Sequence, residues 1–199
     1  MVTEHDIARA ARALAAGELV VFPTETVYGI GCDALNAEAL TRLCEAKNRP
    51  SEKGIAVILG DAAMLSRITT TAGERARTLA DAFWPGPLTL LVESRAELPS
   101  QIVRDGRTGC RVSGDDVARR LSAALGRPLA SPSANLSDQP PAQEIEAARA
   151  YFGDAVAVYL DDGPRSGTPS TLVDPGPPLR ILRQGPIDEH AIQSVLPTP

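Results

Sequence analysis

The sequence has few of the side chains that most often bind metals or act as general bases. It has two histidines, His5 and His190, near opposite ends of the chain, and three scattered cysteines without metal-ligand spacing. No Gly-x-Ser-x-Gly motif occurs, so we expect neither a Ser-His-Asp hydrolase nor a metal site. An odd, sparse number of cysteines is typical of a reducing compartment, and we expect a cytoplasmic protein.

Long apolar runs and aromatic side chains are also scarce. The longest apolar runs, such as residues 19–22 and 55–59, are the length of strands, so no membrane span is expected. Aromatic residues make up 4% of the chain and the formal net charge is −5, which argues against extensive binding of nucleic acid. A local basic patch at Lys47, Arg49 and Lys53 remains compatible with this charge.

The 199 residues contain 43% hydrophobic and 23% charged residues, which suits one globular core. Helices and strands alternate early, and strands cluster late. This order favours an α/β domain with a twisted, mixed β-sheet and helices packed around it. We expect this domain over residues 1–190 and a C-terminal tail over 191–199. Apolar periodicity and capping residues predict helices over 3–16, 36–47, 73–84, 115–125, 143–152 and 188–195. The predicted strands are 18–22, 55–59, 88–92, 109–112, 129–131, 155–160, 170–173 and 179–182.

Polar residues gather where several predicted strands end. Residues 23–31 hold hydroxyls, a carboxylate, a phenol and glycines, which fits either a pocket for a small polar ligand or a capped turn. Residues 131–137 offer three hydroxyls and an amide to a phosphate or a ribose, but such a run is also common in turns. Hydroxyls open the strand at 170–173, and Arg183 follows the next strand.

Three cations are placed where an anion could bind. Lys47 and Arg49 could clamp a triphosphate, although complementarity to the end of the preceding helix is the better explanation when these residues are taken by themselves. Arg111 lies within an otherwise apolar strand and needs an anionic partner. That partner is either a ligand carboxylate or a protein carboxylate such as Glu25 or Asp174.

Taken together and in order, these segments resemble the YrdC-like family of threonylcarbamoyl-AMP synthases, in its short, single-domain form. The resemblance covers almost the whole chain, and its first stretch is the most specific. The matching stretches are FPTETVYGIG at 22–31, KNRP at 47–50, WPGPLT at 84–89, CRV at 110–112, SPSANLS at 131–137, STLVD at 170–174 and ILRQG at 181–185.

The resemblance implies a nucleotidyltransferase that joins L-threonine, bicarbonate and ATP, with Mg²⁺ on the triphosphate, into threonylcarbamoyl-AMP and pyrophosphate. The product would pass to transferase complex proteins that modify tRNA, with at most weak tRNA contact by this chain. Arg111 would pair with the threonine carboxylate, and Lys47 and Arg49 would be catalytic. The implied threonine site is Thr24, Tyr28, Arg111 and Ser170. The implied ATP site is Lys47, Arg49, Ser131, Ser133, Asn135 and Arg183.

Two positions depart from the pattern of this family, and two other functions stay open. Ile58 stands where the family has histidine, and Asp138 stands where it has glycine.

One alternative function is an RNA-binding protein of the same fold without adenylate-forming activity. The other is a carbamoyltransferase that forms carbamoyl-adenylate from carbamoyl phosphate.

Overall fold

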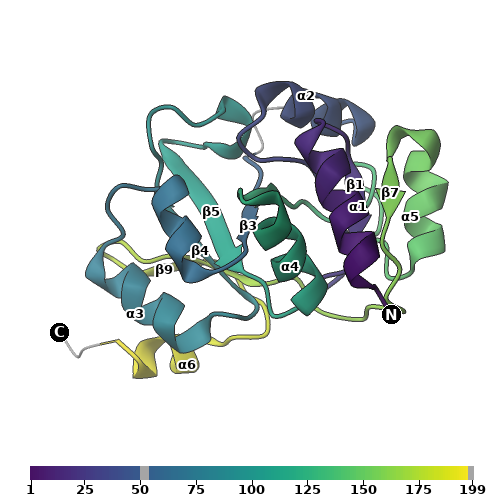
Figure 1. Cartoon of the computed structure of the whole chain (residues 1–199). Helices are drawn as coiled ribbons and strands as arrows, with labels where there is room; N and C mark the ends of the chain where they lie inside the picture. Colours follow the sequence, from purple (N-terminus) through teal and green to yellow (C-terminus); the bar gives the residue numbers. More distant parts are fainter. Residues whose placement is uncertain (50–53, 197–199) are drawn as a thin grey trace.

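The computed structural model of the chain describes residues 1–49 and 54–196 (Figure 1). Its strands are β1 (Val20–Phe22), β2 (Gly29–Gly31), β3 (Val57–Leu59), β4 (Leu88–Glu93), β5 (Arg107–Val112), β6 (Leu129–Ala130), β7 (Val158–Tyr159), β8 (Thr171–Asp174) and β9 (Arg180–Arg183). They form a small sheet of order β2-β1-β7 and a larger sheet of order β6-β3-β5-β4-β8-β9. Both sheets mix parallel and antiparallel pairs, which confirms the predicted mixed α/β class.

Six helices match the six predicted ones. They are α1 (Glu4–Ala15), α2 (Ala37–Ala46), α3 (Glu74–Phe83), α4 (Asp116–Leu125), α5 (Ile145–Phe152) and α6 (Glu189–Ser194). Side chains set several of their starts, because Thr3, Asn36 and Asp115 accept hydrogen bonds from the first backbone N–H groups of α1, α2 and α4. Gly126 ends α4 in the left-handed conformation, with a φ of 70°. Three short 3₁₀ helices span Ala62–Arg67, Ser100–Ile102 and Gly153–Ala155.

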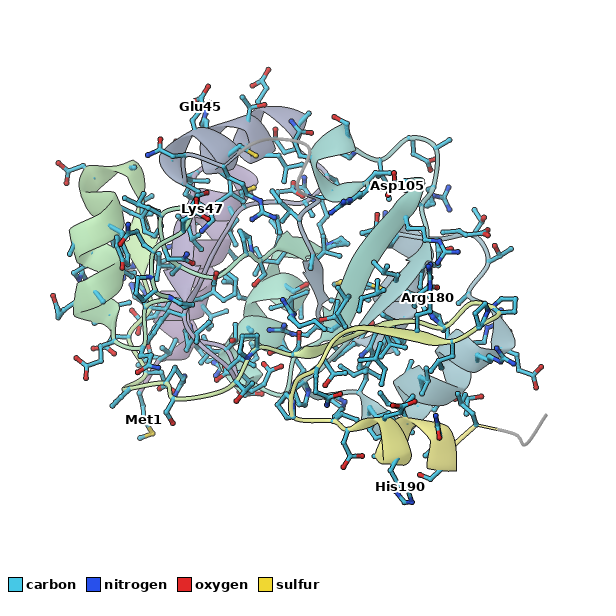
Figure 2. The ribbon with its side chains drawn as sticks, turned by 180° about the vertical axis from the view of Figure 1, so that it is seen from behind. Met1, Glu45, Lys47, Asp105, Arg180 and His190 are labelled. Carbon is cyan, nitrogen blue, oxygen red and sulfur yellow. The ribbon has the colours of Figure 1, made fainter. Side chains whose placement is uncertain are left out.

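The helices bury one face of the larger sheet and leave part of the other face to the site. Leu88 and Leu90 of β4 pack with Leu79 of α3 and Ile192 of α6, so alternate residues of β4 point away from these helices. Helices α1 and α4 cover β1 and β3, and Figure 1 shows α1, α3 and α4 on the viewer's side of the strands. From behind, in Figure 2, the ribbon of β9 lies in front, with Arg180 labelled beside it.

The structure differs from the sequence prediction in three places. Strand β2 was expected to be loop, but it pairs antiparallel with β1 over the whole length of both strands. The strands divide into two sheets instead of one. The expected boundary between residues 190 and 191 falls inside α6, whose Ile192 is buried. Pro50, Lys53 and residues 197–199 lie outside the described residues.

Ile58 and Asp138, the two departures from the family pattern, both occupy positions that suit their side chains. Ile58 is buried among apolar residues of α1 and α4, so it fills the core. Asp138 adopts a positive φ of 66°, in the region that glycine favours and that Asp enters more readily than most residues. Within the described part of the chain, no helix is both long and apolar enough to cross a membrane.

The two sheets meet at Gly31, and we expect this contact to tolerate no side chain. A Cβ on Gly31 would lie 2.1 Å from the carbonyl oxygen of Ala130 in β6. Gly31→Ala should therefore lower the free energy of unfolding by about 1–3 kcal/mol or more, as overpacking does. The measurement is urea unfolding followed by the fluorescence of Trp84. Gly73→Ala is the matched control, because no atom lies within 4 Å of its added Cβ, and it should change stability by less than about 1 kcal/mol. Equal stability of the two variants would contradict the contact.

Candidate active site

A cavity of about 280 Å³ lies between the segments that follow β1 and β6 and the strands β4, β5, β8 and β9. Eight of the ten residues expected in the site line it, whereas Lys47 and Asn135 do not. No acidic residue is among the described residues that line this cavity. The eight residues are Thr24, Tyr28, Arg49, Arg111, Ser131, Ser133, Ser170 and Arg183.

The segment after β1 is held in shape by its own hydroxyls. Thr24 Oγ1 donates to the carbonyl oxygen of Val27 (2.6 Å) and accepts from the backbone N–H of Thr26 (3.2 Å). The two threonine hydroxyls also lie 2.9 Å apart, and both residues are buried. This confirms the capped turn that local sequence suggested, and the same segment lines the cavity.

Tyr28 fastens a distant segment of the chain to this turn. Its hydroxyl lies 2.8 Å from the carbonyl oxygen of Gly163 and accepts from the backbone N–H of Asp162 at 3.2 Å. Burial raises the pKa of the phenol. The guanidinium of Arg165 lies 6.0 Å from the centre of the Tyr28 ring. The Tyr28 hydroxyl is therefore engaged by the segment between β7 and β8, while the rest of the residue lines the cavity.

Two arginines meet at the hydroxyl of Ser170. Arg111 Nη1 lies 3.3 Å from Ser170 Oγ, and Arg183 Nη2 lies 3.1 Å from it. Arg183 Nε also donates to the backbone oxygen of Ser170 (3.0 Å). Burial lowers the pKa of Arg183, and the nearby charge of Arg111 lowers it further. Two like charges held together in a cavity favour the binding of an anion.

Arg111 also has a protein partner. It is paired with Glu25, which is one of the alternatives that the sequence left open. Arg111 Nε lies 3.3 Å from Glu25 Oε1, but neither atom makes a hydrogen bond of acceptable geometry. The other carboxylate oxygen of Glu25 accepts a hydrogen bond from Ser113 Oγ. Burial lowers the pKa of Arg111, and the charge of Glu25 opposes this effect. The pair leaves the Nη atoms of Arg111 directed to Ser170 and the cavity.

Lys47 and Arg49 follow α2 but lie in different surroundings. Lys47 is only 2% exposed, and its Nζ donates to the carbonyl oxygens of Ser133 (2.5 Å) and Asn135. Burial lowers the pKa of Lys47 to about 8, and the charge of Arg49 acts in the same direction. Arg49 Nη2 donates to the backbone oxygen of Gly54 (3.1 Å), and Arg49 lines the cavity. In Figure 2, Lys47 lies below α2, whereas Glu45 projects outward.

The loop after β6 is fixed from two sides. Ser133 Oγ donates to Asn135 Oδ1 (2.5 Å), and Asn135 Nδ2 donates to the backbone oxygens of Leu136 and Gln139 (2.8 Å each). The backbone N–H of Ala134 donates to the backbone carbonyl oxygen of Tyr28 (2.7 Å), and this bond joins the loop to the residue that precedes β2. The side chain of Asn135 is thus engaged within the loop, and Ser131 and Ser133 face the cavity.

Two further hydroxyl residues line the cavity and were not singled out from the sequence. Thr26 belongs to the turn after β1, and Thr89 lies on β4 with its Oγ1 2.8 Å from Ser170 Oγ. Thr89 could have been identified from the sequence, because this polar residue lies between Leu88 and Leu90 and so points to the opposite face of the predicted strand. Glu25 was named from the sequence as a partner of Arg111, whereas no sequence signal pointed to Ser113, whose hydroxyl donates to Glu25.

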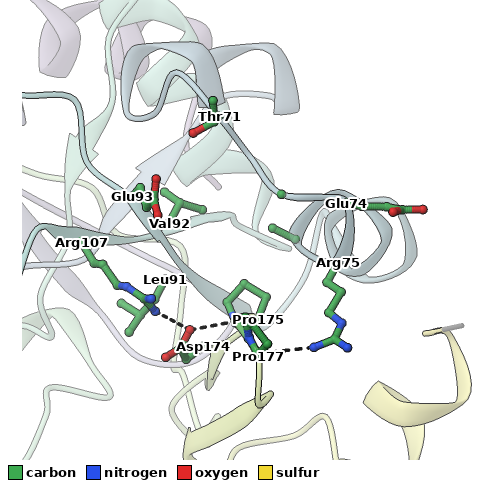
Figure 3. A pocket seen from close by; sticks show the side chains of 13 residues that line it. Thr71, Glu74, Arg75, Leu91, Val92, Glu93, Arg107, Asp174, Pro175 and Pro177 are labelled. Atoms are coloured by element: carbon green, nitrogen blue, oxygen red, sulfur yellow. Dashed lines mark hydrogen bonds and ion pairs between the residues drawn. The ribbon is translucent and has the colours of Figure 1, made fainter. Parts of the chain in front are cut away.

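A larger hollow of about 530 Å³ lies between the start of α3 and the end of β8 (Figure 3). Its Asp174 is paired with Arg107, and also with Arg180 at 2.7 Å, so Asp174 is not the partner of Arg111. Arg75 reaches the backbone oxygen of Gly176 at 3.5 Å. Because no residue expected in the site lines this hollow, we assign the chemistry to the smaller cavity.

Comparison with known proteins decides the family. The Sua5/YciO/YrdC family model, described as "telomere recombination", matches residues 12–185. The chain belongs to this family. Its YrdC-like domain is 40% identical over 193 residues to a putative threonylcarbamoyl-AMP synthase of Mycobacterium tuberculosis, covering 96% of this chain and 88% of that protein. It is also 36% identical to threonylcarbamoyl-AMP synthase of Vibrio cholerae, covering 93% of this chain and 100% of that protein.

Longer members of the Sua5/YciO/YrdC family share the same fold. Threonylcarbamoyl-AMP synthase of Bacillus subtilis is 37% identical over 197 residues, and these span 97% of this chain but 57% of that protein. The structure of Pyrococcus abyssi Sua5 complexed with L-threonine superposes with a TM-score of 0.93 at 32% identity. That match covers 98% of this chain and 58% of the P. abyssi chain.

The different surroundings of Lys47 and Arg49 predict different effects of substitution. Lys47→Met removes the donor from two carbonyl groups and should lower the free energy of unfolding by about 2 kcal/mol, because unsatisfied buried acceptors cost about 1–3 kcal/mol. Arg49→Ala should instead keep stability within about 1 kcal/mol and strongly weaken the use of ATP. Melting temperature and the ATP dependence of pyrophosphate release measure both effects. A fully stable Lys47→Met protein, or an Arg49→Ala protein with normal ATP saturation, would refute this division.

Proposed function

We propose that the chain is an L-threonylcarbamoyladenylate synthase that forms threonylcarbamoyl-AMP and pyrophosphate from L-threonine, bicarbonate and ATP. The observation that carries the proposal is the cluster of Arg111, Arg183 and Ser170 in a cavity whose described lining has no acidic residue. Such a cavity suits anionic reactants. The names of the relatives in the Sua5/YciO/YrdC family support the same reaction.

The proposed chemistry depends mainly on holding reactants in place. The amine of threonine forms a bond to the carbon of carbon dioxide derived from bicarbonate and loses a proton, which gives a carbamate. A carbamate oxygen then attacks the α-phosphorus of ATP, and the bond to the bridging oxygen breaks to release pyrophosphate. Positioning and charge stabilisation can supply most of such a rate enhancement.

Each wall of the cavity contributes to one reactant. Arg111 pairs with the threonine carboxylate, and Ser170 supports the guanidinium at 3.3 Å. Arg49 faces the phosphates, and Ser131 and Ser133 line the nucleotide side. Thr24 and Tyr28 close the end of the threonine site through the turn after β1. We keep Arg183 on the ATP side, as the family resemblance implies, and its hydrogen bonds to Ser170 hold it next to the threonine site.

Lys47 and Asn135 act on the nucleotide through the loop that carries Ser131 and Ser133. Lys47 holds two carbonyl oxygens of this loop, and Asn135 holds Ser133. We therefore assign Lys47 and Asn135 to positioning of the ATP site, and we keep direct contact with the substrate for Arg49. Buried residues of this kind determine how accurately a neighbouring group is placed.

The described residues do not fit a resident metal site. They contain no group of three or more His, Cys, Asp or Glu side chains that could hold an ion. Glu25, the carboxylate behind Arg111, is already engaged by Ser113. We propose that Mg²⁺ arrives with the triphosphate and is held by phosphate oxygens and water. Separate transferase proteins that act on tRNA in the cytoplasm would then consume the adenylate.

The first test is substrate selection by the whole chain. We expect pyrophosphate release to require both bicarbonate and L-threonine, with valine rejected by roughly 10⁴-fold, because a site built to bond a hydroxyl leaves polar groups unpaired when it is missing. Pyrophosphate and product mass are measured with a panel of amino acids and with carbamoyl phosphate. Equal turnover of valine and threonine would contradict the proposal. Turnover of carbamoyl phosphate without threonine would favour a carbamoyltransferase, and salt-sensitive RNA binding without adenylate formation would favour an RNA-binding protein.

A further inference from the structure

Thr89 lines the cavity from β4, which lies between β5 and β8 in the larger sheet. Arg111 is on β5, and Ser170 directly precedes β8, so Thr89 lies between the strands that carry these two residues of the proposed threonine site. Its side chain points away from α3, because its neighbours Leu88 and Leu90 pack against that helix. The residue is 2% exposed and lines the cavity together with Arg111 and Ser170. A buried threonine in a strand can simply pack, so its hydrogen bonds decide whether it has another role.

The hydrogen bonds around Ser170 fix which hydroxyl donates to which. Ser170 Oγ lies 3.3 Å from Arg111 Nη1, 3.1 Å from Arg183 Nη2 and 2.8 Å from Thr89 Oγ1. A guanidinium can only donate, and a hydroxyl has one hydrogen and two acceptor positions. The two arginines therefore fill both acceptor positions of Ser170. The hydrogen of Ser170 then has to be donated to Thr89.

The consequence is that Thr89 keeps its own hydrogen for another partner. Its Oγ1 accepts from Ser170, and within the described residues Ser170 is the one hydrogen-bond partner of this hydroxyl. Because arginine stays protonated at physiological pH, the direction of this chain of hydrogen bonds does not reverse. Arg111 and Thr89 thus each offer a donor to the cavity, and Thr89 keeps one further acceptor position.

A carboxylate is the group of the proposed substrate that fits such a surface. An ionised carboxylate only accepts hydrogen bonds and can take both donors with its two oxygens, whereas a single hydroxyl offers one oxygen and the amine has to stay available for the carbamate. The phosphate-facing residues Arg49 and Ser133 come from other segments of the lining. Charge-assisted hydrogen bonds of this type are roughly twice as strong as neutral ones.

We propose that Thr89 is a substrate-positioning residue that donates a hydrogen bond to the carboxylate of the amino-acid substrate beside Arg111. This inference rests on the proposed function, because it takes L-threonine as the ligand. Ser170 sets the direction of the bond, and the two arginines set the direction of Ser170. Loss of the Thr89 hydroxyl therefore weakens amino-acid binding more than it weakens ATP use.

The test compares binding of L-threonine by calorimetry with the ATP dependence of pyrophosphate release. Thr89→Val keeps the shape of the side chain and removes the donor, so the Kd for L-threonine should rise about 10- to 100-fold, the range for a hydrogen bond to a charged group. Half-saturation by ATP should change less than about 3-fold, a shift equivalent to only ~0.65 kcal/mol. Thr89→Ser keeps the hydroxyl and should bind L-threonine nearly as well as the wild type. Thr89→Ala provides a second variant without the hydroxyl if Thr89→Val does not fold.

Thr108→Val is the matched control for purely structural loss. Thr108 is buried on β5, and its hydroxyl pairs with Ser94 Oγ at 2.8 Å outside the cavity lining. This variant should lose stability to a similar extent and keep the wild-type Kd for L-threonine. An unchanged Kd in Thr89→Val, or an equal loss for L-threonine and ATP, would overturn the role of Thr89 while leaving the proposed function intact. A wild type that neither binds L-threonine nor releases pyrophosphate would overturn both.

Discussion

The constraint on which the site depends is the close approach of two guanidinium groups on one sheet face, the largely buried Arg111 and the more exposed Arg183. Each loses hydration there, and their charges repel each other, so the cavity is unfavourable without an anion. Ser170 relieves part of this cost by accepting from both. Glu25 relieves another part, but its geometry with Arg111 leaves one atom on each side without a hydrogen bond. The protein thus holds its cations in place and leaves their remaining donors to a ligand.

A second layer of residues gives this arrangement its shape. Lys47 holds the loop after β6, and Tyr28 holds the segment between β7 and β8. Both residues lie in segments that local sequence connects with ligands, yet their polar atoms bind the protein backbone. The segments of this chain that resemble the Sua5/YciO/YrdC family therefore combine residues that face the cavity with residues that hold other segments in place. Substitution of the second kind should reduce stability as well as activity.

Much of the fold could be predicted from the sequence, because apolar periodicity and caps such as Thr3, Asn36 and Asp115 are local signals. Strand β2 could not, since Gly-Ile-Gly has little intrinsic strand preference and its conformation comes from pairing with β1. Motif order located the hydroxyls and cations of the site. The inward direction of Lys47 depends on carbonyl groups more than 80 residues away, at Ser133 and Asn135, and no local pattern reports such a contact.

The most direct test of the central claim is an experimental structure with L-threonine and a non-hydrolysable ATP analogue bound together. The threonine carboxylate should lie within hydrogen-bonding distance of the Arg111 guanidinium, with the triphosphate extending toward Arg49 along the wall that carries Ser131 and Ser133. A triphosphate bound at Arg111, with the amino acid elsewhere or absent, would contradict the assignment of the Arg111 guanidinium to a carboxylate.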